Sequence, residues 1–120
     1  MKLSVAEFLT QLPQPASDKY SEGVPFVTAF AHGTMSIELF APRGADLQTP
    51  HEQDEIYVVV SGSGDFVRNG EFINFTAGDV LFVPAGMPHH FENFSADFVT
   101  WVIFYGAKGG ENNLSTGNGE

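Results

Sequence analysis

The residues of this chain best suited to chemistry are histidines and a glutamate with regular spacing. Side chains of an extended segment alternate between its two faces, so residues an even number of positions apart point the same way. His51 and Glu55 therefore share one face if this segment is extended. The same face carries Thr49, Gln53 and Tyr57. Imidazole and carboxylate groups gathered in this way are typical ligands of a divalent metal ion.

A second histidine, His89, begins a later run in which Phe91 and Asn93 share its parity. If a barrel turns His51 and Glu55 inward, an adjacent strand can bring His89 to them. Two imidazoles and one carboxylate make up the facial triad that binds divalent iron and leaves positions open for substrate and dioxygen. Divalent manganese, nickel, cobalt, copper and zinc accept the same donors, so the residues predict a divalent ion without fixing its identity.

Two more residues on this face receive predicted roles. Gln53 lies on the same face as His51 and Glu55 and is predicted as a further metal ligand. Tyr57 is predicted as a catalytic residue that handles a proton or orients the substrate. Asp54 and His90 have the opposite parity, which predicts that Asp54 is solvated and that His90 is exposed or lies behind a ligand.

The segment GDVLFVPAGMPHHFEN, residues 78–93, has a turn glycine, a short apolar run, a Pro-Ala-Gly corner and then a histidine. It reads G-x5-P-x-G-x2-H-x3-N at every fixed position: Gly78, Pro84, Gly86, His89 and Asn93. This is the second signature of the cupin superfamily, which the chain resembles. Because five fixed positions over sixteen residues rarely coincide by accident, the resemblance is specific.

The upstream segment follows the first cupin signature, G-x5-H-x-H-x3,4-E-x6-G, less closely. Glu55 and Gly62 have the required gap, and His51 then falls on the second histidine. Thr49 stands at the first histidine position, and Gly44 is one residue out of step. The resemblance therefore implies four ligand positions, which fall on Thr49, His51, Glu55 and His89. The side chains at the last three positions can bind a metal ion.

The threonine at the first ligand position leaves two interpretations open. In one, a metal is bound more weakly, and either Gln53 or an additional water fills the remaining position. In the other, the chain has lost the metal, as some cupins have, and His51 and Glu55 are hydrogen-bonded to each other. Burying a carboxylate and two imidazoles with nothing to bind costs free energy, which favours the metal site.

From Pro25 onward, short apolar runs alternate with turn residues, which predicts an all-β domain. Asn69-Gly70 is a strong hairpin signal, because both central residues of a type I′ turn have positive φ. The predicted strands are Phe26–Ala31, Thr34–Ala41, Glu55–Ser61, Gly64–Arg68, Glu71–Phe75, Val80–Val83, His89–Phe94 and Phe98–Tyr105. With no helix between them, they indicate an antiparallel sandwich or barrel, and the resemblance selects the double-stranded β-helix, or jelly-roll, cupin barrel.

The residues from Ser4 to Glu7 form a capping box that predicts a short N-terminal helix, which Pro13 and Pro15 end. We expect an N-terminal helix and extended arm over residues 1–24, the cupin barrel over residues 25–106, and a flexible tail over residues 107–120. The tail is rich in glycine, asparagine and serine, which disfavours a packed structure.

The charge balance excludes several classes of partner. Fifteen acidic residues against five scattered basic ones give a formal net charge of −10. Proteins that bind nucleic acid gather lysine and arginine against its phosphates, and the same scarcity disfavours a phosphorylated substrate. No apolar run reaches the roughly 18 residues of a membrane helix, and the N-terminal residues lack the pattern of a secretory signal. We therefore expect a cytoplasmic protein that binds neither nucleic acid nor membranes.

Three classes of function remain. The leading expectation is a small metal-binding cupin, such as a mononuclear-metal dioxygenase acting on a small carbonyl, enol or phenolic compound. The second is a metal-dependent isomerase or lyase in which Tyr57 or His90 moves a proton. The third is a non-catalytic cupin that binds or senses a small molecule. The resemblance also implies a homodimer, for which apolar residues ahead of the barrel motifs could supply an edge strand: Val24, Phe26, Val27 and Phe30.

Overall fold

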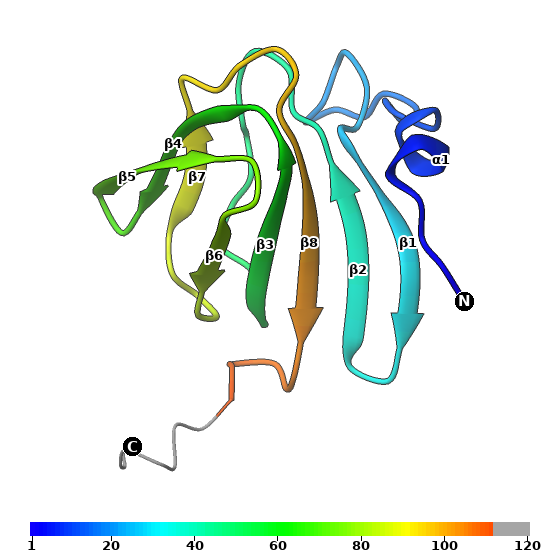
Figure 1. Ribbon diagram of the computed structural model, residues 1–120. Helices are drawn as coiled ribbons and strands as arrows, with labels where there is room; N and C mark the ends of the chain where they lie inside the picture. The colour runs from blue at the N-terminus through cyan, green and yellow to red at the C-terminus, as the bar shows by residue number, and fades with distance from the viewer. Residues whose placement is uncertain (112–120) are drawn as a thin grey trace.

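The computed structural model describes residues 1–111, and most of the regular structure in them is β-strand (Figure 1). One helix, α1 (Val5–Leu9), precedes eight strands within these residues. The strands are β1 (Phe26–His32), β2 (Met35–Phe40), β3 (Asp54–Ser61), β4 (Ser63–Arg68), β5 (Glu71–Thr76), β6 (Val80–Val83), β7 (His89–Glu92) and β8 (Val99–Tyr105). All eight predicted strands are confirmed, with bounds that differ by at most two residues from those expected.

The strands form two antiparallel sheets. The larger sheet has the order β1-β2-β8-β3-β6, and the smaller has the order β5-β4-β7 (Figure 1). Strands far apart in the sequence are therefore neighbours, as β8 is to both β2 and β3. This crossed order is the predicted jelly-roll, and it places Glu55 of β3 opposite Phe104 of β8 and Val83 of β6.

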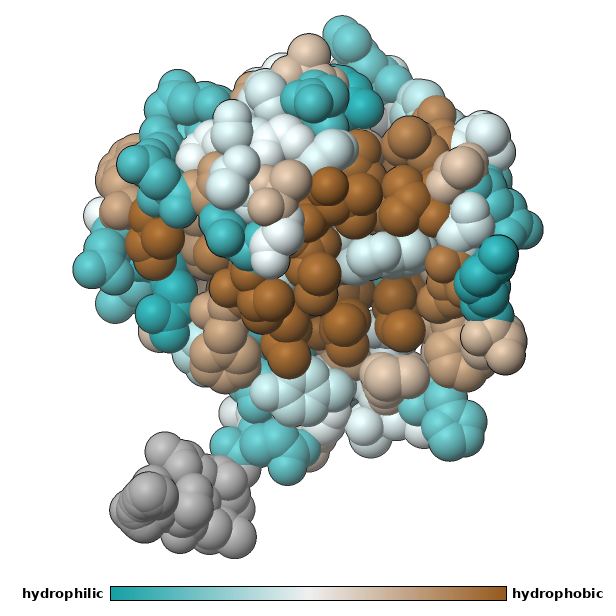
Figure 2. All heavy atoms as spheres, in the orientation of Figure 1, coloured by the Kyte–Doolittle hydropathy of each residue, from teal (hydrophilic) through white to brown (hydrophobic). Residues whose placement is uncertain are grey.

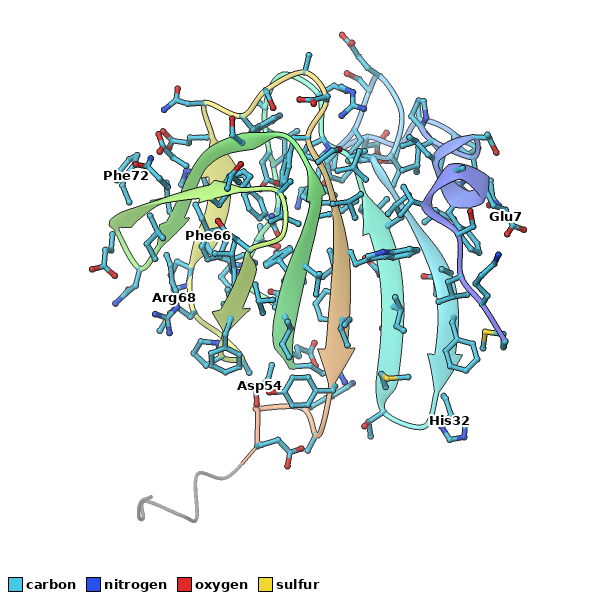
Figure 3. All side chains as sticks on the ribbon, viewed as in Figure 1. Glu7, His32, Asp54, Phe66, Arg68 and Phe72 are labelled. Atoms are coloured by element: carbon cyan, nitrogen blue, oxygen red, sulfur yellow. The ribbon has the colours of Figure 1, made fainter. Side chains whose placement is uncertain are left out.

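Aromatic side chains fill the space between the sheets. The ring of Phe91 on β7 packs against Phe66, Phe75 and Phe98, with centroids 4.8 to 5.3 Å apart. Phe66 lies between the sheets in Figure 3, whereas Phe72 lies on the outside of the β4–β5 hairpin. Such rings bury large apolar areas, and their packing makes the smaller sheet a rigid support for the strand that carries His89.

The N-terminal helix packs on the larger sheet. Its cap is the predicted one, because the Ser4 hydroxyl accepts a hydrogen bond from the backbone N–H of Glu7 (3.5 Å). The apolar side of the helix covers Leu39, Ala41 and Val99 with Val5, Phe8 and Leu9. This second apolar cluster closes part of the outer face of the sheet.

Residues 107–111 return to the start of β3. The N–H of Gly109 donates to the carbonyl of Glu52 (2.7 Å), and that of Glu111 donates to the Asp54 carboxylate (2.9 Å). The rest of the predicted tail, residues 112–120, lies outside the described residues, and the division of the chain at residues 24 and 106 stays a prediction. No helix in residues 1–111 is long and apolar enough to cross a membrane.

Candidate metal centre

A cavity of about 610 Å³ lies against the inner face of the larger sheet. Strands β2, β3 and β8 supply one wall, residues 48–53 supply another, and Lys19 and Tyr20 of the N-terminal arm lie at its edge. The polar residues among those that line it include Ser36, Glu38, Gln48, Thr49, His51, Gln53, Glu55 and Tyr57. Phe26, Phe40, Val102 and Phe104 make up its apolar surface. The cavity thus combines an apolar wall with a larger set of converging polar side chains that could fix the orientation of a small molecule.

His51, Glu55 and His89 meet in this region as predicted. One carboxylate oxygen of Glu55, Oε1, lies 2.8 Å from His51 Nδ1 and 2.9 Å from His89 Nε2. One potential ligand atom from each residue falls within 4.8 Å of the other two. His51 is the most exposed of the three, with a side chain 33% accessible, so the centre opens toward solvent on the His51 side.

Glu55 is the most deeply buried member of the group. Its side chain is inaccessible to solvent, and its second oxygen, Oε2, has no hydrogen-bond partner in residues 1–111. Burial opposes ionisation, but hydrogen bonds from His51 and His89, together with their positive charge, outweigh it and lower the pKa of Glu55. Glu55 is therefore an ionised carboxylate whose second oxygen, Oε2, has electron pairs available to a cation.

His89 has its ring orientation fixed by the backbone. Its Nδ1 lies 2.9 Å from the carbonyl oxygen of Met87, which only accepts hydrogen bonds. Burial opposes protonation of this imidazole, but the hydrogen bond and negative charge of Glu55, and the Met87 carbonyl, raise the pKa of His89. The side chain is fully buried, so both nitrogens depend on partners inside the protein.

The Pro-Ala-Gly corner holds the loop that bears His51. The N–H of Gly86 donates to the carbonyl of His51 (2.8 Å), and that of Ala85 donates to the Asp54 carboxylate (2.9 Å). The prediction that Asp54 is solvated is wrong, because residues 85 and 111 cover it and it is buried. Figure 3 shows Asp54 beside the segment that follows β8. The second sequence motif thus positions a candidate ligand that belongs to the first.

The family can be decided once this geometry is known. The sequence model of the Cupin domain matches residues 36–105, more than half of the chain, from the second residue of β2 to the last residue of β8. The chain is a cupin. The fold and both motif regions had indicated the same family.

This cupin is similar to several known proteins. An uncharacterized protein of Streptomyces coelicolor is 40% identical over 72 residues, which cover 58% of this chain and 69% of that protein. A cupin-2 domain protein of Shewanella frigidimarina has a TM-score of 0.63 at 15% identity, covering 87% of this chain and 94% of the other. A Cupin 2 conserved barrel domain protein of Salinispora arenicola has a TM-score of 0.59 at 20% identity, covering 68% and 75%. At these identities the two solved structures show the shared fold.

The donor set of this cupin fits a divalent ion. Donors bonded to one ion at about 2.1 Å and at right angles are about 3 Å apart, which is the spacing of the Glu55 oxygen from each imidazole. The unpartnered Oε2 of Glu55 is a further acceptor in the interior. Buried acceptors without donors are costly, and a cation removes that cost.

Gln53 lines the pocket with the other residues of its predicted face, and Gln48 lines it as well, although no role was predicted for Gln48. β3 begins only at Asp54, so both residues lie before the strand. The Gln53 amide donates to the carbonyls of Thr34 (2.8 Å) and Gly106 (2.9 Å), and its role as a metal ligand stays a prediction. Gln48, which the motifs did not identify, has its Oε1 3.0 Å from His89 Nε2.

Tyr57 and His90 lie on different sides of the barrel wall. The Tyr57 hydroxyl is buried and donates to Gln48 Oε1 (3.0 Å). Burial, followed by the negative charges of Glu55 and Asp46, raises the pKa of Tyr57 well above its ordinary value, so the hydroxyl keeps its proton. The His90 side chain is 37% exposed and pairs with Glu92, outside the residues that line the pocket.

Glu38 is a second carboxylate in the pocket that the motifs did not reveal. It lies on β2 in register with Val102 of β8, which is in turn opposite Tyr57. No hydrogen bond to its side chain occurs in the part of the chain that the structure describes. Burial raises the pKa of Glu38, the charge of His51 opposes the rise, and that of Glu55 adds to it.

Replacing Glu38 by glutamine is expected to stabilise the metal-free protein at neutral pH by about 1 kcal/mol, the scale of one poorly solvated polar group. Because its folded-state pKa is raised, Glu38 lowers stability as pH rises through that pKa. The advantage of glutamine should therefore vanish below the ordinary value of 4.5, where Glu38 is protonated in both states. Thermal unfolding of the wild type and of Glu38→Gln, from about pH 4 to about pH 8, measures this difference in stability. A difference that does not change with pH would contradict this account.

Proposed function

We propose that this cupin holds a divalent metal ion through His51, Glu55 and His89, and binds a small molecule that chelates the ion through adjacent oxygens. Iron, manganese, nickel, cobalt, copper and zinc all suit these donors. The observation that carries the proposal is the ionised Glu55, whose spare oxygen and two imidazole partners converge beside an open pocket of about 610 Å³.

The reaction best supported is oxygenation of a small carbonyl, enol or phenolic compound. The bound ion supplies Lewis-acid activation of the chelating oxygens and, where it is iron, reaction with dioxygen. Phe40, Val102 and Phe104 exclude water from the ring or chain of the substrate. Tyr57 orients rather than ionises, because its hydroxyl keeps its proton and donates a hydrogen bond to Gln48 Oε1. Because the pocket has this apolar wall and few basic side chains, it suits a neutral or weakly polar substrate.

Oxygen uptake tests this function. Protein reconstituted with Fe(II) under anaerobic conditions, then mixed with dioxygen and a panel of β-dicarbonyls and polyphenols, is expected to consume oxygen together with at least one of them. His90→Ala should match the wild type, because His90 lies outside the pocket, and His51→Ala should show no uptake. An electrode trace that stays at the background rate across the panel would remove the oxygenase proposal.

Glu38 favours a second candidate, an isomerase or lyase. A carboxylate without a hydrogen-bond partner in the described residues faces the same pocket as Glu55 and can take a proton from a carbon next to a chelated carbonyl. Product formation without oxygen consumption, lost in Glu38→Gln, distinguishes this reaction from the first. Binding without turnover in either assay would leave the third class, a non-catalytic cupin.

We also propose that the protein is a homodimer. The outer face of the larger sheet carries an apolar surface, seen in Figure 2 as the brown area over the strands at the front of Figure 1. Val80 and Phe82 on the edge strand β6 are 64% and 44% exposed, and they continue a row of outward side chains that includes Ile56, Val58, Trp101 and Ile103. An exposed apolar surface of this kind is typical of an interface. The oligomeric state in solution tests the proposal.

A further inference from the structure

The side chain of Gln48 is fixed in one orientation beside the candidate metal centre. Its Nε2 donates to the Asp46 carboxylate, which also accepts from the backbone N–H of Gln48 (3.2 Å) and of Phe91 (2.9 Å). A carboxylate at this position accepts hydrogen bonds, so the amide nitrogen must face Asp46 and the amide oxygen must face away from it. That oxygen points to Tyr57 and His89, at 3.0 Å from each.

The two atoms within hydrogen-bond distance of His89 Nε2 are both oxygens that can donate an electron pair to a cation. His89 Nδ1 faces the Met87 carbonyl and must carry a proton there, so once the ring gives up its second proton to bind a cation, the lone pair is on Nε2. Nε2 lies 2.9 Å from Glu55 Oε1 and 3.0 Å from Gln48 Oε1. A single proton on Nε2 can lie along one of these directions only. A cation placed among the three atoms interacts favourably with all of them.

The spacing is also that of neighbouring metal ligands. Gln48 Oε1 lies 3.0 Å from His89 Nε2 and the Glu55 oxygen lies 2.9 Å from it, both close to the separation of about 3 Å between adjacent donors at bonds of about 2.1 Å. Gln48 comes directly before Thr49, the residue that stands at the first ligand position of the family. The loop therefore offers an amide oxygen one position earlier than the expected imidazole.

We propose that Gln48 Oε1 is the fourth protein ligand of the metal centre, in place of the side chain at position 49; the inference rests on the centre proposed above. The resulting set of two imidazole nitrogens, a carboxylate and an amide oxygen is harder than a set with three imidazoles. Carbonyl and carboxylate ligands suit manganese and iron better than copper. Tyr57 and Asp46 act as positioning residues, because each holds the Gln48 amide rather than the ion.

The test compares metal affinities of four variants, with Co(II) and Zn(II) as the probes. Gln48→Leu is expected to weaken binding about 10- to 100-fold, the range found when a supporting group of a metal site is lost. It should also change the visible absorption of bound Co(II), which reports coordination number. Gln53→Leu and Thr49→Val, changed at the other two positions considered for this ligand, should keep the Kd within about twofold and leave the spectrum unchanged. His51→Ala should abolish binding.

A second measurement uses the wild-type protein and does not depend on how a variant folds. With ¹⁵N-labelled glutamine, Zn(II) is expected to shift the side-chain amide signals of Gln48 and to leave those of Gln53 in place. Unmoved Gln48 signals, together with unchanged affinity in Gln48→Leu, would overturn the proposed ligand while the loss of binding in His51→Ala keeps the metal centre. Failure of the wild type to bind either ion would overturn both.

Discussion

A divalent ion at a thousand times its Kd is expected to raise the unfolding free energy of the wild-type protein by about 4 kcal/mol, and His89→Ala is expected to lose nearly all of that gain. His89 is fully buried and its Nε2 lies 2.9 Å from Glu55 Oε1. Without His89, only His51 and Glu55 of the three proposed ligands remain, and the ion no longer links β3 to β7. Calorimetry with Zn(II) and with a chelator measures the gain, which corresponds to a shift on the order of 10 °C.

His90→Ala is the matched control for this prediction. The residue is next in the chain, yet its side chain is partly exposed and pairs with Glu92 rather than with Glu55. It should keep the full metal-dependent gain. Each protein is compared with its own metal-free form, so any loss of stability from the cavity left by His89 cancels. A gain in His89→Ala equal to that of the wild type would show that the ion binds elsewhere.

The strands were predictable because each is a short apolar run bounded by turn residues. At Asn69, φ is +51°, and at Gly70 it is +83°, as the Asn-Gly hairpin requires. At Gly86, φ is +80°, and its N–H supports His51, which gives a physical reason for the glycine of the second motif. Which strands become neighbours was not encoded in these local patterns. The resemblance selected the jelly-roll barrel, and the pairing of β8 with β2 and β3 is known from the structure.

The candidate site was predictable only where a motif or a strand fixed the side chains. Glu55 and His89 lie on strands, and His51 is held by the corner that the second motif describes. Gln48 lies in a loop, where the alternation of a strand does not apply, and its position depends on the distant Asp46 carboxylate and Tyr57 hydroxyl. No spacing of residues in the sequence predicts such an arrangement.

Two other differences follow from contacts across the fold. The alternation of β2 puts Ser36 and Glu38 on the same face as Phe40, and all three line the pocket. Asp54 has the opposite parity to Glu55, as predicted, but the segment after β8 returns to cover it. Parity gives the face on which a side chain lies and says nothing about what covers that face.

Gly62→Ala is expected to destabilise the protein by about 3 kcal/mol or more, because two separate costs add. Gly62 joins β3 to β4 at a φ of +88°, where a side chain costs roughly 1 to 2 kcal/mol. A Cβ at this position would also lie 2.6 Å from the Cα of Phe98 and 2.7 Å from the hydroxyl of Ser95. Backbone atoms cannot move aside as a flexible side chain can, so the loop that contains Phe98 must shift. Urea unfolding measures the loss.

Gly78→Ala separates the two costs. Gly78 has nearly the same φ, +93°, but a Cβ there would meet nothing within 4 Å. It should therefore show only the backbone cost, roughly 1 to 2 kcal/mol. The excess loss in Gly62→Ala then belongs to the contact with Phe98, which packs on Phe91 and through it supports the strand of His89. Equal losses of unfolding free energy in the two variants would show that the loop containing Phe98 shifts at no cost. Gly62, the last glycine of the first motif, would then be required only for its positive φ.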